Sequence, residues 1–267
     1  MRHSLAVFLL LTLAACSSSH VDPKAQDLAN KVPAEELYAQ AQTDMEDGNL
    51  EKAIKSLETL QSRYPYGRYA QQAQMEIAYA YYKHEEPEAA LTAVDRFIKQ
   101  YPNSQNLDYV LYLKGLINFI DNTGFLQRLS QQDPAERDPQ SAKDSFDAFR
   151  ELVTRFPDSI YAPDARIRMQ YLTNLLARAE IQVASYYLRR GAYVAAVARA
   201  NNVLKEFPET PQTRDALQIM IQAYDAMGQK DLRDDAQRVL DQNMAKDGIK
   251  PGTQKYVIGE KPWWRFW

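Results

Sequence analysis

Apolar residues recur along this chain at helical spacing, in pairs of segments that are joined by short turns. The clearest pair turns at Asp47-Gly48-Asn49-Leu50 and continues with Ala53, Leu57 and Leu60 before it stops at Tyr64-Pro65. Glycine adopts backbone conformations that other residues avoid, and proline cannot continue a helix. This spacing is that of one buried helix face. The pattern therefore predicts a helical hairpin, two antiparallel helices joined by a tight turn.

The same pattern is repeated along the chain, with small or apolar residues followed by an aromatic residue and proline. The later copies stop at Tyr101-Pro102, Phe156-Pro157 and Phe207-Pro208, and a last hairpin lacks this ending. The period is close to the ~34 residues of a tetratricopeptide repeat. We therefore predict an all-α fold of about five tetratricopeptide-like hairpins in one superhelical array. The five hairpins are expected at about 34–67, 71–104, 108–157, 163–208 and 213–246.

Two features interrupt this regularity. An insertion from Asn122 to Gln140, rich in Asp, Gln and Pro, separates the two helices of the third hairpin. Long loops on repeat arrays are often functional, although a solvated spacer explains this one equally well. Residues 164–190 contain no helix breaker and predict one long helix or two nearly collinear ones. Gly115 is expected where the paired helix of the third hairpin comes close.

The first residues predict a secretory signal rather than part of the fold. Arg2 and His3 precede an apolar run that is too short to span a bilayer, and the run ends in Leu13-Ala14-Ala15-Cys16. This ending resembles a bacterial lipobox, in which the cysteine thiol carries a diacylglyceryl group. We therefore expect a signal peptide at 1–15, lipidation at Cys16 and a lipidated flexible tether at 16–33. The alternative is an ordinary signal peptide with an incidental cysteine.

The last segment, residues 247–267, does not continue the helical pattern, because glycine and proline recur in it. All three tryptophans of the chain lie here, at Trp263, Trp264 and Trp267. Exposed tryptophan seldom persists without a partner. This aromatic tail is expected to fold back on the repeats, to sit at a membrane interface or to insert into another protein.

Composition argues against several classes of function. The net charge is only −3, so no basic field indicates nucleic acid. His84 is the one histidine outside the signal and the tether, and Cys16 is the only cysteine. Neither a nucleophile paired with a base nor a metal-binding or phosphate-binding motif is present in the sequence. We therefore predict a protein that is not an enzyme and that needs no metal or cofactor.

The remaining candidate is a binding surface. The first helix of each hairpin lines the concave side of a tetratricopeptide superhelix. In the N-terminal repeats those positions are aromatic with polar ends, which suits an extended peptide because tyrosine has few torsions to freeze. Packing between helices is the alternative for any single tyrosine. The groove positions are Tyr38, Gln42, Met45, Met75, Tyr79, Tyr82, Tyr109 and Tyr112.

The C-terminal repeats are more polar at the corresponding positions, which suggests a second partner. Arg189, Arg190 and Arg199 are expected to gather near the turn of the fourth hairpin and to form charged contacts with a folded neighbour. For Arg189 and Arg190, the favourable interaction of a cation with a helix C-terminus is an equally good explanation.

Taken together, a lipobox followed by five such hairpins resembles the BamD (ComL) family, lipoprotein subunits of the outer-membrane beta-barrel assembly machinery. The resemblance covers nearly all of the chain after the signal. The segments that carry it are Leu37-Tyr38-Ala39, Tyr64-Pro65-Tyr66-Gly67, Ala78-Tyr79-Ala80-Tyr81-Tyr82-Lys83, Asp108-Tyr109, Arg137-Asp138-Pro139, Phe156-Pro157-Asp158-Ser159 and Arg190-Gly191-Ala192-Tyr193-Val194-Ala195.

This resemblance implies a lipid-anchored scaffold on the periplasmic face of the outer membrane. The C-terminal repeats would dock a POTRA domain of BamA, with Arg199 at the contact. The N-terminal repeats would receive unfolded outer-membrane proteins or another Bam lipoprotein, with Tyr64 near the receiving end. The aromatic tail departs from the family pattern, so the resemblance assigns it no role. The alternative is a lipoprotein adaptor of another envelope machine, for pilus secretion or peptidoglycan synthesis.

Overall fold

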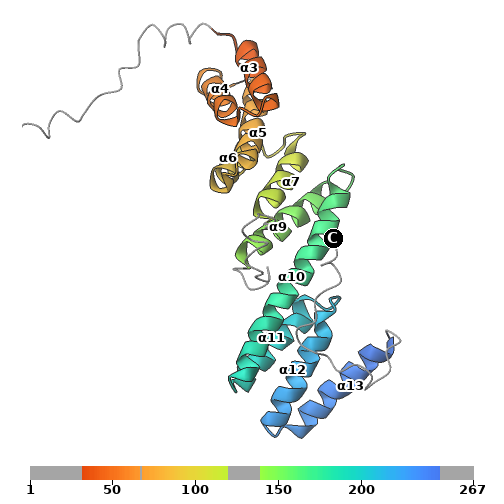
Figure 1. The fold of residues 1–267 in the computed structure, drawn as a ribbon. Coiled ribbons are helices and arrows are strands. Elements are labelled where there is room, and N and C mark those ends of the chain that lie inside the picture. The colour runs from red at the N-terminus through yellow and green to blue at the C-terminus, as the bar shows by residue number, and fades with distance from the viewer. Residues whose placement is uncertain (1–31, 67, 120–138, 247–267) are drawn as a thin grey trace, which may run out of the picture. The chain divides into compact units, whose positions relative to one another are not determined.

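The computed structural model describes residues 32–66, 68–119 and 139–246 (Figure 1). All the regular secondary structure in these ranges is α-helical. The predictions for the signal, Cys16, most of the tether, most of the insertion and the aromatic tail lie outside them. The helices are α3 (Ala34–Glu46), α4 (Leu50–Arg63), α5 (Arg68–Lys83), α6 (Pro87–Gln100), α7 (Leu107–Asn118), α9 (Gln140–Arg155), α10 (Ala162–Arg189), α11 (Tyr193–Glu206), α12 (Gln212–Ala226) and α13 (Lys230–Lys246).

The predicted all-α fold is confirmed. By its internal contacts the chain divides into two compact units, Met1–Ala93 and Val94–Trp267. The boundary falls inside α6. Each unit is a set of helices that pack on their neighbours in the chain. In addition, α3 contacts α5 in the first unit and α10 contacts α12 in the second, so the first helices of successive hairpins lie side by side.

Four hairpins turn through a residue in the left-handed region of the backbone. Gly48, Gly191 and Gly228 have φ of 76°, 74° and 72°, and Glu85 has φ of 62° in the equivalent place. In all four turns, the next amide donates to the carbonyl oxygen of the residue five positions earlier. These hydrogen bonds satisfy carbonyls that the end of a helix would leave unpaired. Glu85 thus occupies a position that favours glycine.

The aromatic residue before each proline ends the second helix of its hairpin. The amide of Tyr64 donates to Leu60 at 2.8 Å, and the amide of Phe156 donates to Leu152 at the same distance. Both residues then leave the helical region, with ψ of 62° and 63°. The ring of a following proline disfavours helical backbone in the residue before it. The aromatic-proline pair therefore stops α4 and α9 where the sequence predicts.

Small residues bring the helices of the first unit together. Ala41 on α3 and Ala53 on α4 are completely buried, as is Leu57 one turn further along α4. The first residues of α4 repeat the apolar spacing from which the hairpin is predicted. This packing holds α3 against both α4 and α5, and it fixes the surface that α3 and α5 share.

In the second unit, α7 and α9 approach each other closely at Gly115 on α7. Its carbonyl oxygen accepts a hydrogen bond from the Ser145 hydroxyl on α9 at 2.8 Å, and the buried ring of Phe149 lies over its Cα. A Cβ atom at this position would lie 2.5 Å from Cδ1 and 2.6 Å from Cζ of that ring. The prediction that Gly115 marks a close approach is confirmed.

α10 is one continuous helix of 28 residues, which decides between the two predictions for this region. Its first half contributes Ala165 and Leu172 to a core with α7 and α9. Its second half contributes Ala177 and Ala184 to a separate core with α11 and α12. Figure 1 shows α10 passing along α9 and then along α11 and α12.

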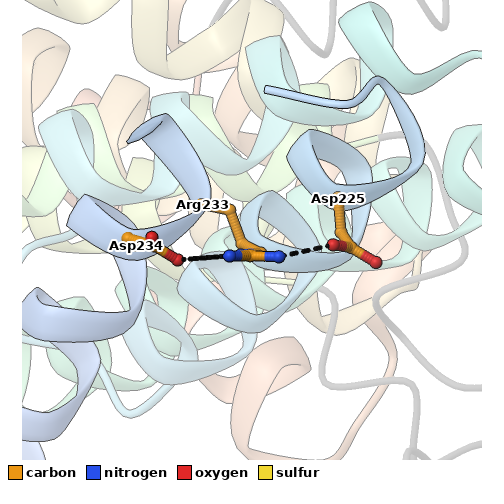
Figure 2. A network of polar contacts seen from close by, with 3 residues as sticks. All are labelled: Asp225, Arg233 and Asp234. Carbon is orange, nitrogen blue, oxygen red and sulfur yellow. Dashed lines mark hydrogen bonds and ion pairs between the residues drawn. The ribbon is translucent and has the colours of Figure 1, made fainter. Parts of the chain in front are cut away.

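The last described hairpin is closed by a charged network (Figure 2). Arg233 on α13 donates to Asp225 on α12 at 2.9 Å, and to Asp234 at 2.8 and 2.7 Å. The hydrogen bonds with Asp234 and then Asp225 raise the pKa of Arg233. The network joins the two helices next to the turn at Gly228.

Candidate binding surfaces

A groove lies between α3 and α5 in the first unit, with a volume of about 580 Å³. The rings of Tyr38 and Tyr69 stand beside one another in it, with their centroids 5.3 Å apart and their planes at 41°. Tilted pairs of this kind present both a ring face and a ring edge to a ligand. The lining residues are Glu35, Tyr38, Ala39, Gln42, Tyr69 and Gln72.

The carboxylate of Glu76 is held in place beside this groove. The Tyr38 hydroxyl donates to Oε1 at 2.5 Å, and Gln42 Nε2 donates to Oε2 at 2.5 Å. Gln72 Nε2 adds a third, longer hydrogen bond of 3.2 Å to Oε1. Tyr38 and Gln42 are one turn apart on α3, and Gln72 and Glu76 are one turn apart on α5, so each pair shares a helix face. The two faces meet at the carboxylate.

Burial, and after it the hydrogen bond to Glu76, raises the pKa of Tyr38 well above its ordinary value. The phenol therefore stays neutral and keeps donating to Glu76 at any pH near neutrality. All three donors to the carboxylate are uncharged. Among the described side chains that line the groove there is no lysine, arginine or histidine.

The other groove candidates of the first unit lie outside this lining. Met45 on α3 and Met75, Tyr79 and Tyr82 on α5 are half-buried. Tyr64 lies after the end of α4, where its hydroxyl donates to the carbonyl oxygen of Val32 at 3.0 Å. That contact ties the residues before α3 to the end of the first hairpin. The structure thus brings Tyr38 and Gln42 together and gives Tyr64 a separate role.

Tyr109 and Tyr112 belong to the second unit and do not line this groove. Their rings pack on Tyr161, with centroid distances of 5.6 Å for Tyr109 and 4.9 Å for Tyr112. The Tyr112 hydroxyl donates to Asp164 at 2.7 Å, and Arg168 donates to the same oxygen at 2.6 Å. These contacts match the alternative left open above, in which a tyrosine packs between helices.

The Asp164 carboxylate is the negatively charged group of this cluster. Burial raises its pKa, but the hydrogen bonds from Arg168 and Tyr112 and the charge of Arg168 outweigh burial, so the pKa of Asp164 is lowered. Burial and the hydrogen bond to Asp164 raise the pKa of Tyr112. The cluster therefore has a neutral tyrosine and an ion pair at neutral pH.

In the second unit, Arg199 on α11 faces Glu180 on α10. Its Nη1 atom lies 3.2 and 3.3 Å from the two carboxylate oxygens of Glu180, and both side chains are partly exposed. Arg189 and Arg190 are exposed at the end of α10. Arg199 is six residues into α11, roughly 9 Å along its axis, and does not join them. The three arginines therefore do not form the cluster predicted from the sequence.

Exposed apolar side chains lie near the turn instead. Tyr186 is 51% exposed and Val194 is 74% exposed, on either side of the α10–α11 turn. The guanidinium of Arg190 stacks over the Tyr186 ring at 5.9 Å from its centroid. Exposed apolar side chains with an arginine beside them are typical of a protein contact.

Comparison with known proteins places the chain in a family. Residues 30–239 match the family model YfiO, described as outer membrane lipoprotein. The chain is 40% identical to "Outer membrane protein assembly factor BamD" of Neisseria meningitidis serogroup A / serotype 4A, over 98% of each chain. This chain belongs to the BamD family.

Another BamD, that of Vibrio cholerae serotype O1, is 37% identical over 88% of this chain and 95% of its own. The solved structure of a putative kinesin light chain with TPR-like repeats from Podosopora anserina has a TM-score of 0.35 and 16% identity. That alignment covers 85% of this chain and all of the other. Membership of the BamD family therefore rests on sequence along nearly the whole chain.

Two groups at the groove were missed in the sequence, Tyr69 and Glu76. Tyr69 is the second residue of α5, and Glu76 lies one position after the predicted Met75. The signal that would have found Glu76 is its spacing of one turn from Gln72, which lines the groove. A shift of one residue in helix phase turns a side chain by about 100°.

Within the three described ranges, no helix combines the length and apolarity needed to cross a membrane. No group of three or more histidine, cysteine or acidic side chains in the same ranges is arranged to hold a metal ion. His84 lies at the α5–α6 turn, where Nδ1 is 2.7 Å from Glu86 and Nε2 is 3.8 Å from Glu51.

Proposed function

We propose that this chain is a lipid-anchored scaffold of the outer-membrane beta-barrel assembly machinery. Cys16 carries the lipid, and the helical units lie on the periplasmic side. The chain binds unfolded outer-membrane proteins and BamA, and it performs no chemical step. Support comes from the relatives, which are named outer membrane protein assembly factors. Other Bam lipoproteins are further expected partners.

The groove between α3 and α5 carries the substrate-binding part of this proposal. Tyrosine rings that are already packed against each other lose little entropy when a ligand arrives. The Glu76 network fixes Tyr38 from its hydroxyl end, so the ring is held in one orientation. A short extended segment with aromatic side chains fits such a surface.

The partner-binding part is assigned to the α10–α11 hairpin. Arg199 is held by Glu180 but keeps 43% of its side chain exposed, so it has donors to offer to a second protein. Tyr186 and Val194 supply apolar area on the same two helices. Arginine at the edge of an apolar patch is a common arrangement in protein interfaces.

The test exchanges the charges of the Arg199 pair. Arg199→Glu alone places two carboxylates together, so it weakens the hairpin as well as any external contact. The double variant Glu180→Arg/Arg199→Glu restores the ion pair between α10 and α11. It reverses only the charges that the hairpin presents to a partner protein. Each C-terminally tagged variant is captured from gently solubilised outer membranes, and BamA is quantified in the capture by mass spectrometry.

We expect the double variant to regain the thermal stability that the single variant loses, while BamA recovery stays low. The matched control exchanges the charges of another ion pair, Lys114 on α7 and Asp95 on α6, whose charged atoms are 2.7 Å apart. We expect this control to recover as much BamA as the unchanged chain. Recovery of BamA with the Glu180→Arg/Arg199→Glu chain would show that Arg199 acts only inside the hairpin. Capture of pilus or wall-synthesis proteins in place of BamA would overturn the proposed function.

A further inference from the structure

We propose that the aromatic tail, residues 247–267, folds back on its own chain and packs against the upstream half of α10. The receiving surface is the open face of α10, the exposed side around Ile160 and Ile167 that Tyr171 borders. This inference goes beyond the proposed function and does not depend on it.

The open face exists because α10 is twice as long as the helix that pairs with it. α10 has 28 residues and α11 has 14, so α11 runs back along the downstream half of α10 only (Figure 1). That half packs on α11 and α12. The upstream half packs through Ala165 and Leu172 on the core that it shares with α7 and α9. Its opposite side is left exposed.

Helix phase relates the open face to a surface that is covered further along α10. Ile181 packs against the core formed with α11 and α12. Ile167 precedes Ile181 by 14 residues, and fourteen steps of about 100° bring the two side chains within about 40° of each other around the helix axis. Ile167 is nevertheless 68% exposed. An apolar stripe therefore continues past the point at which its covering helices end.

The open face has a second exposed isoleucine and an aromatic border. Ile160, two residues before α10, is 82% exposed. The ring of Tyr171 lies 5.5 Å from the ring of Phe119 and is thus already packed in part. The free apolar area therefore belongs mainly to the two isoleucines. Burying both would be favourable, because the gain grows with the apolar area removed from water.

The tail begins at the end of the hairpins that lies near the middle of α10. α11 runs back to that level, α12 starts five residues later, and α13 runs back along α12, so Lys246 ends α13 at the level where α12 starts. The 21 residues of the tail can extend to at most about 70 Å. Half of α10 is about 21 Å long, and the width of two helices adds about 20 Å. The tail therefore reaches the whole open face.

The tail also carries the apolar area that such a face needs. Its last five residues include Trp263, Trp264, Phe266 and Trp267, and a covered aromatic side chain buries about 150–250 Å². A segment on the same chain meets the surface at an effective concentration in the millimolar range. Contacts that would be weak between separate molecules are thus enough to keep the tail docked.

Tryptophan fluorescence reports on the tail alone, because all three tryptophans of the chain lie in it. Emission and its quenching by acrylamide are measured on the full mature chain in detergent. Ile167→Asp places a charge on the open face and should lower the ratio of docked to undocked tail at least about tenfold. The emission should then shift to longer wavelength and the quenching should increase.

The matched control is Leu232→Asp. Leu232 is also an exposed apolar residue, but it lies on α13 and outside the open face. This control should leave both fluorescence readouts unchanged. Circular dichroism verifies that each variant keeps its helices, so that a shift in emission reports the tail and not unfolding.

A second measurement identifies what covers the open face. The photoreactive residue p-benzoylphenylalanine replaces Gln170, which is exposed on α10 between Ile167 and Tyr171. The cross-linked peptides are identified by mass spectrometry. We expect links from position 170 to residues 247–267 of the same chain, and fewer of them in the Ile167→Asp background.

Links to the tail together with a shift that is specific to Ile167→Asp support the inference. Links to residues 120–138 or to a second copy of the chain would overturn it. Emission that Ile167→Asp leaves unchanged would also overturn it, as expected for a tail buried in the detergent micelle, and so would an equal shift in Leu232→Asp. None of these results depends on the recovery of BamA, which tests the proposed function separately.

Discussion

The contact between Gly115 and Phe149 allows a stability prediction with a magnitude. Gly115→Ala adds one methyl group, which would lie 2.5 Å from Cδ1 and 2.6 Å from Cζ of a completely buried ring. Real carbon contacts need about 3.5–4.0 Å, so the two helices must separate by roughly 1 Å or the ring must turn. Overpacking of this kind costs about 1–3 kcal/mol.

A second effect acts in the opposite direction. Alanine is favoured over glycine inside a helix by about 1 kcal/mol, and Gly115 is an interior residue of α7. The Ser145 hydrogen bond to the Gly115 carbonyl oxygen, at 2.8 Å, also lengthens if the helices move apart. A net loss of about 1–2 kcal/mol is expected, which lowers the melting temperature by roughly 2–8 °C for a chain of this size.

The assay is urea unfolding followed by circular dichroism, with Phe149→Leu as the partner in a double-mutant cycle. Phe149→Leu alone destabilises, because it leaves a cavity. In the Gly115→Ala background it also makes room for the methyl group, so the double variant should be more stable than the sum of the two single changes predicts. Additive effects, or a Gly115→Ala chain as stable as the wild type, would refute the close-approach argument.

The remaining predictions concern the backbone and pH. Glu85→Gly should raise the free energy of unfolding by about 0.5–1 kcal/mol, because φ of 62° suits glycine, while Glu88→Gly inside α6 should lower it in the same urea assay. The pKa of Asp164 is lower in the folded than in the unfolded chain, so the ionised carboxylate adds to the free energy of unfolding. That contribution is complete at pH values above the ordinary aspartate pKa and is lost as the pH falls through the pKa of the folded state. Asp164→Asn should therefore flatten the loss of stability between about pH 5 and 3, and an unchanged slope would contradict the ion pair with Arg168. The raised pKa values of Tyr38 and Tyr112 have the opposite effect, because stability is then lost as the pH rises above about 10. Absorbance titration near 295 nm should show two tyrosines that ionise at higher pH than the rest.

Much of the fold follows from local chemistry in the sequence. Gly48 permits the left-handed turn that other residues avoid, and Pro65 disfavours helical backbone at Tyr64, so the turn and the end of α4 were predictable. Gly115 was predictable for a different reason, because a helical glycine among apolar residues indicates a close neighbour. Glu85 shows the limit, since its left-handed conformation is imposed by the hairpin and carries no signal of its own.

The binding surfaces depend on contacts between distant residues and were predicted only in part. Tyr38 and Gln42 follow from helix phase, but their shared partner Glu76 lies on another helix, 38 and 34 positions away. Tyr112 has the same type and phase as Tyr38, yet Tyr161 and Asp164 bury it between helices. Arg199 was placed near Arg189 by its distance in sequence, whereas Glu180 holds it inside the hairpin.

The unbroken α10 has a consequence for how this chain tolerates change in length. A helix of 28 residues is about 42 Å long, and each residue advances it by about 1.5 Å and rotates it by about 100°. One residue inserted between Leu172 and Ala177 would leave the upstream core intact and rotate the whole downstream face away from α11 and α12. The two packing faces of α10 therefore keep their relative rotation only when the helix is lengthened or shortened by whole turns.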